Sequence, residues 1–156
     1  MSYASSTSVS VERSRGEIER LLMRYGATQF VTGWTQEAAA IGFVFDGRHI
    51  RIALPLPDID DDEFQLTETG RKRKNQDAVL KAWEQACRSR WRALLLVVKA
   101  KLEAVEVGIS TIEEEFLAWT IVPGSGMTVF QEISQPLATS IESGRAPQLL
   151  LGGDEA

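Results

Sequence analysis

The residues best suited to binding a charged ligand are the lysines and arginines, because they are concentrated in one segment. Between Arg71 and Lys101 the chain has ten of them and only two acids. At about 100° per residue, four of these cations fall within roughly 40° of one another on a helix. A row of cations on one helix face binds nucleic-acid phosphates, with an affinity that falls steeply as salt rises. The sequence therefore predicts a nucleic-acid-binding surface formed by Lys81, Arg88, Arg92 and Lys99 and by the preceding run of Arg71, Lys72, Arg73 and Lys74.

The rest of the chain is strongly acidic, which leaves a second class of function open. Residues 58–68 contain six acids and no base, and residues 102–156 contain nine acids with Arg145 as their only base. Acidic surfaces can bind the basic groove of another protein. The alternative prediction is a protein-binding surface formed by Asp58, Asp60, Asp61, Asp62 and Glu63 and by Glu113, Glu114 and Glu115. In a third interpretation, the basic residues form an ordinary solvated helix face without a ligand, and acidic residues of the same protein compensate their charge.

No arrangement of side chains in the sequence indicates catalysis or a metal centre. His49 is the only histidine and Cys87 the only cysteine, and neither has sequence neighbours that would complete a nucleophilic site. The acidic run 58–62 imitates the first half of an EF-hand loop, but Glu63 stands where that loop needs glycine and Thr69 where it needs glutamate. We therefore expect a protein that is not an enzyme and that has no cofactor and no metal.

The spacing of apolar residues predicts the elements that carry these side chains. We expect a helix over 11–25, strands over 28–35, 38–45 and 48–54, a long helix over 75–107, a short helix from the capping box 110–113 to about residue 119, and a last helix that begins at the capping box 128–131 and ends at Gly144. Asp46-Gly47 is typical of a type I′ hairpin turn. This order is that of an α+β domain, in which helices pack on one face of a three-stranded antiparallel meander.

Three details of this scheme bear on function. Residues 58–75 are predicted to form a long loop, and such loops are often functional. Trp83 and Trp91 map to the core side of the long helix, which leaves few aromatic side chains for stacking on bases. In the last helix, Ile133, Leu137 and Ile141 are expected to face inward.

Length and composition indicate a single globular domain. The chain has 156 residues, of which 44% are hydrophobic and 25% charged. We expect a disordered lead-in over 1–9, one domain over 10–145 and a tail over 146–156. A lone cysteine, no signal-peptide pattern and no apolar run long enough for a bilayer predict a cytoplasmic protein without a membrane partner. The long helix also predicts a homo-oligomer, unless the sheet covers its whole apolar stripe.

Two segments carry a resemblance to a known family: ERSRGEIERLLMRYGATQFVTGW (Glu12–Trp34) and WEQACRSRWRALLLVVKAKLEAVEVGISTIEEEFLAW (Trp83–Trp119). Over roughly residues 11–145, the chain resembles a family of small proteins encoded in tailed phages and prophages. The resemblance brings no established activity, cofactor or catalytic residue with it. It implies an accessory protein that acts inside a bacterial cell, in replication, recombination or transcription, or as an inhibitor of a host or defence factor.

Together with the basic residues, the resemblance gives the first hypothesis: a non-enzymatic phage accessory protein that binds nucleic acid with little regard to sequence. The alternative becomes a phage-encoded inhibitor or adaptor that binds a bacterial host or defence protein through its acidic surfaces.

Overall fold

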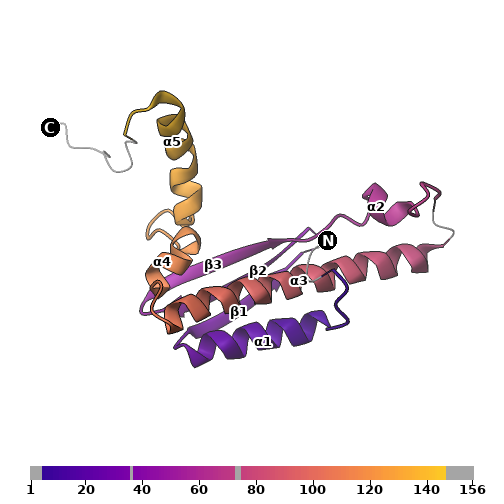
Figure 1. The fold of residues 1–156 in the computed structure, drawn as a ribbon, viewed down its shortest axis with the longest axis horizontal. Helices are drawn as coiled ribbons and strands as arrows, with labels where there is room; N and C mark the ends of the chain where they lie inside the picture. The colour runs from indigo at the N-terminus through magenta and orange to yellow at the C-terminus, as the bar shows by residue number, and fades with distance from the viewer. Residues whose placement is uncertain (1–4, 36, 73–74, 147–156) are drawn as a thin grey trace.

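The fold consists of a small antiparallel sheet, two helices that cover one of its faces, and a helical extension at the C-terminal end. A computed structural model describes residues 5–35, 37–72 and 75–146. The elements follow the order α1 (Val11–Arg24), β1 (Thr28–Trp34), β2 (Ala38–Phe45), β3 (Arg48–Pro55), α2 (Asp62–Gln65), α3 (Gln76–Glu106), α4 (Ile112–Phe116), the 3₁₀ turn η1 (Leu117–Trp119) and α5 (Val129–Ser143) (Figure 1). The predicted α+β class is thereby confirmed. The short helix α2 is an addition, because it lies within the segment that was expected to be a loop.

The sheet has the strand order β1-β2-β3 and is antiparallel throughout. Phe45 pairs with Arg48 around the two-residue turn, in which Asp46 and Gly47 have φ values of 44° and 75°. Positive φ at both central positions is what a type I′ turn requires, so the predicted hairpin is confirmed. On β1 the register shifts between Thr28 and Val31, which is a bulge in this edge strand.

The core lies between the sheet and the helices α1 and α3. Alternate strand residues such as Ile41 and Ile52 are buried against Ile18 of α1 and Val98 of α3. Phe116, which follows α3 in the chain, closes one end of this core and meets Phe43 edge to face, with ring centroids 5.8 Å apart. Full burial of each such apolar side chain contributes about 1.5–3 kcal/mol, so this layer is the main source of stability.

Side-chain caps fix where the helices begin. Ser10 Oγ accepts from the backbone N–H of Arg13 at 3.2 Å, and Asn75 Oδ1 accepts from that of Ala78 at 2.8 Å. From Asn75 the helix α3 continues for 31 residues, or about 46 Å, before Gly108 follows its end. None of the described helices has both the length and the apolar character needed to cross a bilayer. The predicted lead-in and tail lie partly outside the described residues.

The capping box of α4 lies one residue later than predicted. Thr111, not Ser110, is the N-cap residue, and its partner at the third helical position is Glu114, not Glu113. Both positions offer a hydroxyl followed three residues later by glutamate, so the sequence pattern alone fits either register. The second predicted box, Thr128 with Gln131, is confirmed at the start of α5.

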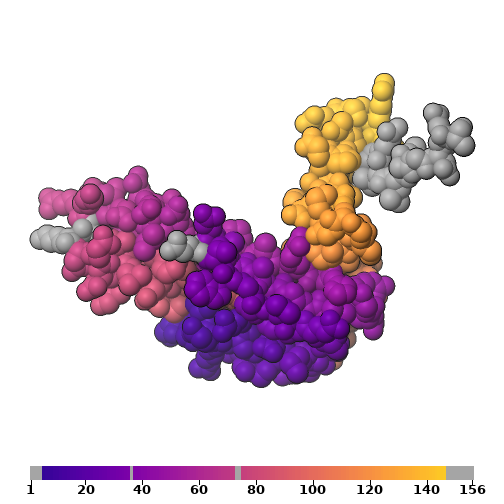
Figure 2. Space-filling view, turned by 180° about the vertical axis from the view of Figure 1, so that it is seen from behind, coloured from indigo at the N-terminus to yellow at the C-terminus, as the bar shows by residue number. Residues whose placement is uncertain are grey.

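The helix α5 differs from the prediction in the direction of its apolar side. None of its residues is buried, and Leu137 and Ile141 are 42% and 74% exposed. Figures 1 and 2 show α5 standing away from the sheet. Its first turns are held by η1 and by Arg51 of β3, which donates to Gln131 Oε1 at 3.3 Å. Helical periodicity shows that a helix is amphipathic but not which surface its apolar side meets, so the predicted inward placement of these two residues is wrong.

Candidate nucleic-acid interface

The helices α1 and α3 lie side by side and run in the same direction (Figure 1). Near their beginnings, the backbone carbonyl of Thr7 accepts from Gln85 Nε2 at 2.8 Å. In the middle, Glu17 Oε2 is 3.3 Å from Arg92 Nη1. Near their ends, burial and the neighbouring Glu106 carboxylate raise the pKa of Tyr25 above its ordinary value. The Thr7–Gln85 and Glu17–Arg92 contacts fix the register in which α1 and the segment before it meet α3.

The four predicted cations of α3 lie along the side of this helix that faces α1, and they differ in what they contact. Lys81 and Lys99 are exposed, and neither forms an ion pair with a residue that the structure describes. Arg92 is committed to the α1–α3 contact through Glu17. Two of the four are therefore free of a carboxylate and exposed, while Arg92 has a structural role as well.

Arg88 is held in place by a neutral side chain. Its Nε and Nη2 donate to Gln85 Oε1 at 3.1 and 2.5 Å. Gln85 in turn donates through Nε2 to the backbone carbonyls of Ser5 and Thr7. Because the partner is an amide, the guanidinium keeps its positive charge uncompensated while its orientation is fixed.

The basic run before α3 is described only in part. Arg71 and Lys72 are exposed and close a small loop, in which Thr67 N–H donates to the Arg71 carbonyl at 2.7 Å and Leu66 bridges to Lys72. Arg73 and Lys74 lie outside the described residues.

A second row of cations, on α1, was missed by sequence reasoning. Arg13, Arg20 and Arg24 all lie on the exposed side of α1, opposite the buried residues Ser14 and Ile18. Their spacing of seven and four residues is the signal that could have identified them. It was hidden because α1 has almost as many glutamates as arginines, so its net charge is unremarkable.

The two rows lie next to each other because α1 and α3 are parallel neighbours. We call the surface formed by Arg13, Arg20 and Arg24 of α1 and by Lys81, Arg88, Arg92 and Lys99 of α3 the cationic face. Glu17 lies between the rows, and α3 has no acid from Gln85 to Leu102. Beyond that point, Glu103 and Glu106 bound the cationic face. The apolar stripe of α3, in contrast, is covered by the sheet and α1 over most of its length, because Leu94, Leu95, Val98 and Leu102 are buried there, whereas Leu80 near its start is 44% exposed.

The structure separates the two acidic segments that were predicted as one partner-binding surface. Asp58–Glu63 lies at α2, beside the first half of α3, whereas Glu113–Glu115 lies in α4 at the opposite end of α3 (Figure 1). Asp58, Asp60, Asp61, Asp62 and Glu63 are exposed, and no ion pair joins them to another described residue. The acidic loop and the basic helix therefore do not neutralise each other through direct pairs within the described ranges.

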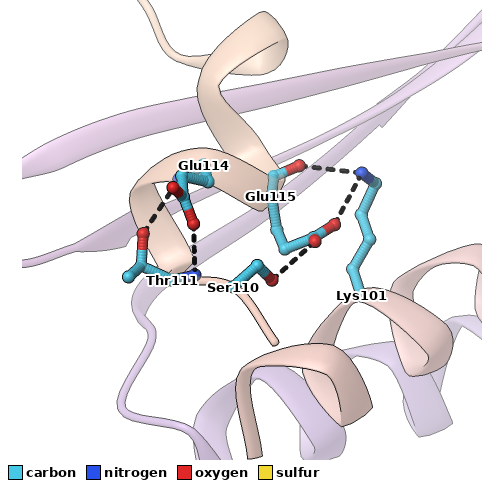
Figure 3. A network of polar contacts seen from close by, with 5 residues as sticks. All are labelled: Lys101, Ser110, Thr111, Glu114 and Glu115. Carbon is cyan, nitrogen blue, oxygen red and sulfur yellow. Dashed lines mark hydrogen bonds and ion pairs between the residues drawn. The ribbon is translucent and has the colours of Figure 1, made fainter. Parts of the chain in front are cut away.

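The three glutamates of α4 are occupied by contacts inside the protein. Glu113 pairs with Arg48 at 3.1 Å, and Glu114 accepts from the Thr111 backbone N–H at 2.9 Å. Figure 3 shows Glu115 between Ser110 Oγ, which donates to its Oε1 at 2.6 Å, and Lys101 Nζ, which lies 3.2 Å from its Oε2. The hydrogen bond from Ser110, followed by that from Lys101, holds the pKa of Glu115 below its usual range. Glu113 and Glu115 thus join α4 to neighbouring parts of the fold, and Glu114 caps the start of α4 itself.

A cavity of about 430 Å³ lies beside the cationic face, where the first turn of α1, the first half of α3 and one end of the sheet meet. Three tryptophans line it. Trp91 is buried. Trp83 is half-buried, and its Nε1 donates to the Pro57 carbonyl at 2.7 Å. Trp34, in contrast, is 75% exposed. Strand alternation places Trp34 on the core side of the sheet, yet its position at the end of an edge strand leaves it open to solvent.

Neither the single histidine nor the single cysteine belongs to the cationic face. His49 is exposed on β3, and Cys87 is buried at the base of the tryptophan-lined cavity, where burial raises the pKa of its thiol. Among the residues that the structure describes, no group of three or more histidine, cysteine, aspartate or glutamate side chains is placed to hold a metal ion.

Comparison with known proteins adds no relative. The chain matches no protein-family model, no curated protein and no solved structure at a significant level.

Proposed function

We propose that this protein binds nucleic acid through the cationic face, as a non-enzymatic phage accessory protein in the cytoplasm of the bacterial host, in replication, recombination or transcription. The observation that carries the proposal is the parallel placement of α1 and α3, which puts Arg13, Arg20 and Arg24 beside the cations of α3 with one carboxylate between the rows. Phosphates follow one another along a nucleic-acid strand, and two neighbouring rows of cations can contact several of them at once.

Binding of this kind is governed by charge and not by base sequence. Each lysine or arginine that neutralises a phosphate releases condensed counterions. The logarithm of the affinity therefore falls linearly with the logarithm of the salt concentration, with a slope proportional to the number of phosphate contacts. Arg88 contributes with little loss of side-chain freedom, because Gln85 already holds its guanidinium. Since backbone phosphates carry no sequence information, we expect similar affinities for unrelated sequences.

The proposal is tested by fluorescence anisotropy of labelled DNA at about 50 and 200 mM salt. Lys99→Glu is the informative variant, because Lys99 is exposed and forms no ion pair in the described structure. It should weaken binding at low salt and reduce the slope of log affinity against log salt by about one contact. Arg20→Glu on the other helix should have the same effect.

The matched control is Arg145→Glu, a reversal of charge just beyond the end of α5, a helix that stands away from α1 and α3 in Figure 1. It should leave affinity and slope unchanged. Equal losses in Lys99→Glu and Arg145→Glu would show that only net charge matters and would contradict a localised interface. Absence of binding at 50 mM salt would overturn the proposal as a whole.

The alternative function, a phage-encoded inhibitor or adaptor of a bacterial host or defence protein, is favoured by one observation. Asp58–Glu63 is an exposed acidic segment without ion pairs in the described structure, whereas Glu113–Glu115 is occupied. A host protein that binds the immobilised wild type should not bind the variant in which Asp60, Asp61 and Asp62 are changed to serine. The same loss of binding should be seen when the purified host protein is mixed with each form. Retention by both forms would contradict this function.

Self-association is a separate element of the proposal. Because most of the apolar stripe of α3 is covered, a homo-oligomer through α3 would have to use its exposed apolar residues, such as Leu80 and Val97, which are each 44% exposed. Light scattering of the purified protein at increasing concentration tests it. A constant monomer mass would exclude it.

A further inference from the structure

The tryptophan-lined cavity beside the cationic face has the properties of a site for a flat aromatic ligand. Its volume of about 430 Å³ is within the range of about 300–1,000 Å³ that is typical of ligand pockets. Trp34 of β1 and Trp83 of α3 line it from different elements, and the buried Trp91 of α3 completes its aromatic lining. An isolated exposed tryptophan needs no explanation, but one that forms the wall of a cavity with two others points to a stacking partner.

Trp34 is held in position by the turn that follows it. Thr35 N–H donates to the Ala38 carbonyl at 2.7 Å, and Thr35 Oγ1 accepts from the backbone N–H groups of Glu37 and Ala38. The pairing of Trp34 with Ala39 belongs to the same β1–β2 ladder. The backbone that carries the exposed indole is therefore held against β2, and a ligand that stacks on the indole need not order this segment.

The rim of the cavity selects among aromatic ligands. It carries two hydrogen-bond donors, Arg15 and Arg88, and two acceptors, Glu12 and Glu84, so its formal charge is zero. A simple anion gains little from a neutral rim, and a purely apolar ligand would offer no hydrogen-bond partner to the charged groups of the rim. A nucleobase fits both features, because it has flat π faces and an edge that carries donors together with acceptors.

Arg88 belongs both to the rim of this cavity and to the cationic face. A strand whose phosphates contact Arg88 and the neighbouring cations of α3 can therefore place one of its bases in the cavity. A paired and stacked base in a duplex cannot enter, because both of its faces and its hydrogen-bonding edge are already occupied. From these observations we infer that the cavity is a nucleobase pocket, and that the ligand of this protein is single-stranded nucleic acid with an unpaired base stacked on Trp34.

This inference rests on the proposed function and is tested by an experiment that separates the two. Three labelled DNA ligands of equal charge are compared at one salt concentration: a mixed-sequence single strand, a strand of the same length made entirely of abasic residues, and a hairpin whose stem is fully paired and whose loop is abasic. The protein should bind the single strand about tenfold or more tightly than the abasic strand, because stacking on an aromatic side chain strengthens binding of each base by this order. The hairpin should bind no better than the abasic strand.

Variants of the full chain assign the preference to the cavity. Trp34→Ala should reduce affinity for the single strand to that for the abasic strand, and Trp34→Phe should keep most of the preference. Val31→Ala is the matched control, since Val31 is an exposed apolar residue of the same strand that does not line the cavity. It should bind like the wild type.

Each outcome decides a different point. Equal, salt-dependent binding of the single and abasic strands would overturn the nucleobase pocket and leave phosphate binding intact. A preference for the single strand that survives in Trp34→Ala would place the bound base elsewhere and would also overturn it. Failure to bind any of the three ligands would overturn the proposed function and the pocket together.

Discussion

Glu17 and Arg92 join α1 to α3, with Glu17 Oε2 3.3 Å from Arg92 Nη1. The same carboxylate reaches Arg13 within α1, with Oε1 3.5 Å from Nε. Glu17 is thus the one acid among the described residues that lies between the two rows of the cationic face. It sets the register of the helices, and it also lowers the positive potential at the centre of the surface that is proposed to bind phosphates.

Glu17→Gln should therefore strengthen nucleic-acid binding while slightly weakening the fold. Removing one negative charge near bound phosphates should raise affinity about two- to fivefold at low salt. The side chains of this pair are about one third exposed, so the free energy of unfolding should fall by about 1 kcal/mol or less. Anisotropy titrations and urea denaturation of the same sample measure both effects. Weaker binding in this variant would show that phosphates do not lie near Glu17.

The contact between α4 and α3 should weaken at acid pH. The pKa of Glu115 is lower in the folded chain than in the unfolded chain, owing to Ser110 first and Lys101 second. Its contribution to stability is therefore present above the ordinary pKa of a glutamate and is lost as the pH falls through the lower, folded value. Glu115→Gln should be less stable than the wild type at pH 7, and the difference should disappear at low pH. Urea denaturation from pH 7 to pH 3 measures this.

Glu63→Gln is the matched control for that experiment, since Glu63 is exposed and forms no ion pair in the described structure. Its free energy of unfolding should equal that of the wild type at each pH. A constant difference between Glu115→Gln and the wild type at every pH would show that packing, and not ionisation, is responsible.

The sequence predicted those parts of the fold that depend on local chemistry. The Asp46–Gly47 turn follows from backbone preference, and α3 follows from apolar residues repeated at helical spacing. The direction of α5 was not predictable, because Leu137 and Ile141 have the same spacing whether or not a surface receives them. The long apolar side of α5 shows that amphipathicity and burial are separate properties.

The sequence singled out only the α3 half of the candidate site, for a related reason. The cations of α3 stand out because acids are scarce around them. The glutamates of α1 lie between its arginines in the sequence. The row of Arg13, Arg20 and Arg24 is recognised only when the residues are mapped onto the faces of a helix. Trp34 was missed because strand alternation gives the side of the sheet on which a residue lies, but not how far the covering helices extend along the strand.

Cys87 should react slowly with thiol reagents in the folded protein. It is buried, and desolvation raises the pKa of its thiol, so less thiolate is present at a given pH than in an exposed cysteine. Alkylation by iodoacetamide at pH 8 should be about tenfold or more slower than in the urea-unfolded chain. Quenched time points analysed by mass spectrometry give both rates. Similar rates in the two states would show that the base of the tryptophan-lined cavity is open to solvent.

Substitution of two apolar helix residues, Phe116 and Ile141, should change the free energy of unfolding by very different amounts. Phe116 is 1% exposed and contacts Phe43 and Phe45, so Phe116→Ala should lower the free energy of unfolding by about 3–5 kcal/mol. Ile141 is 74% exposed on α5, so Ile141→Ser should change it by no more than about 0.5 kcal/mol. Urea denaturation at low protein concentration compares the two variants with the wild type. A loss of several kcal/mol in Ile141→Ser would mean that the apolar side of α5 is covered in solution, and repeating the measurement at high protein concentration would show whether a second copy covers it.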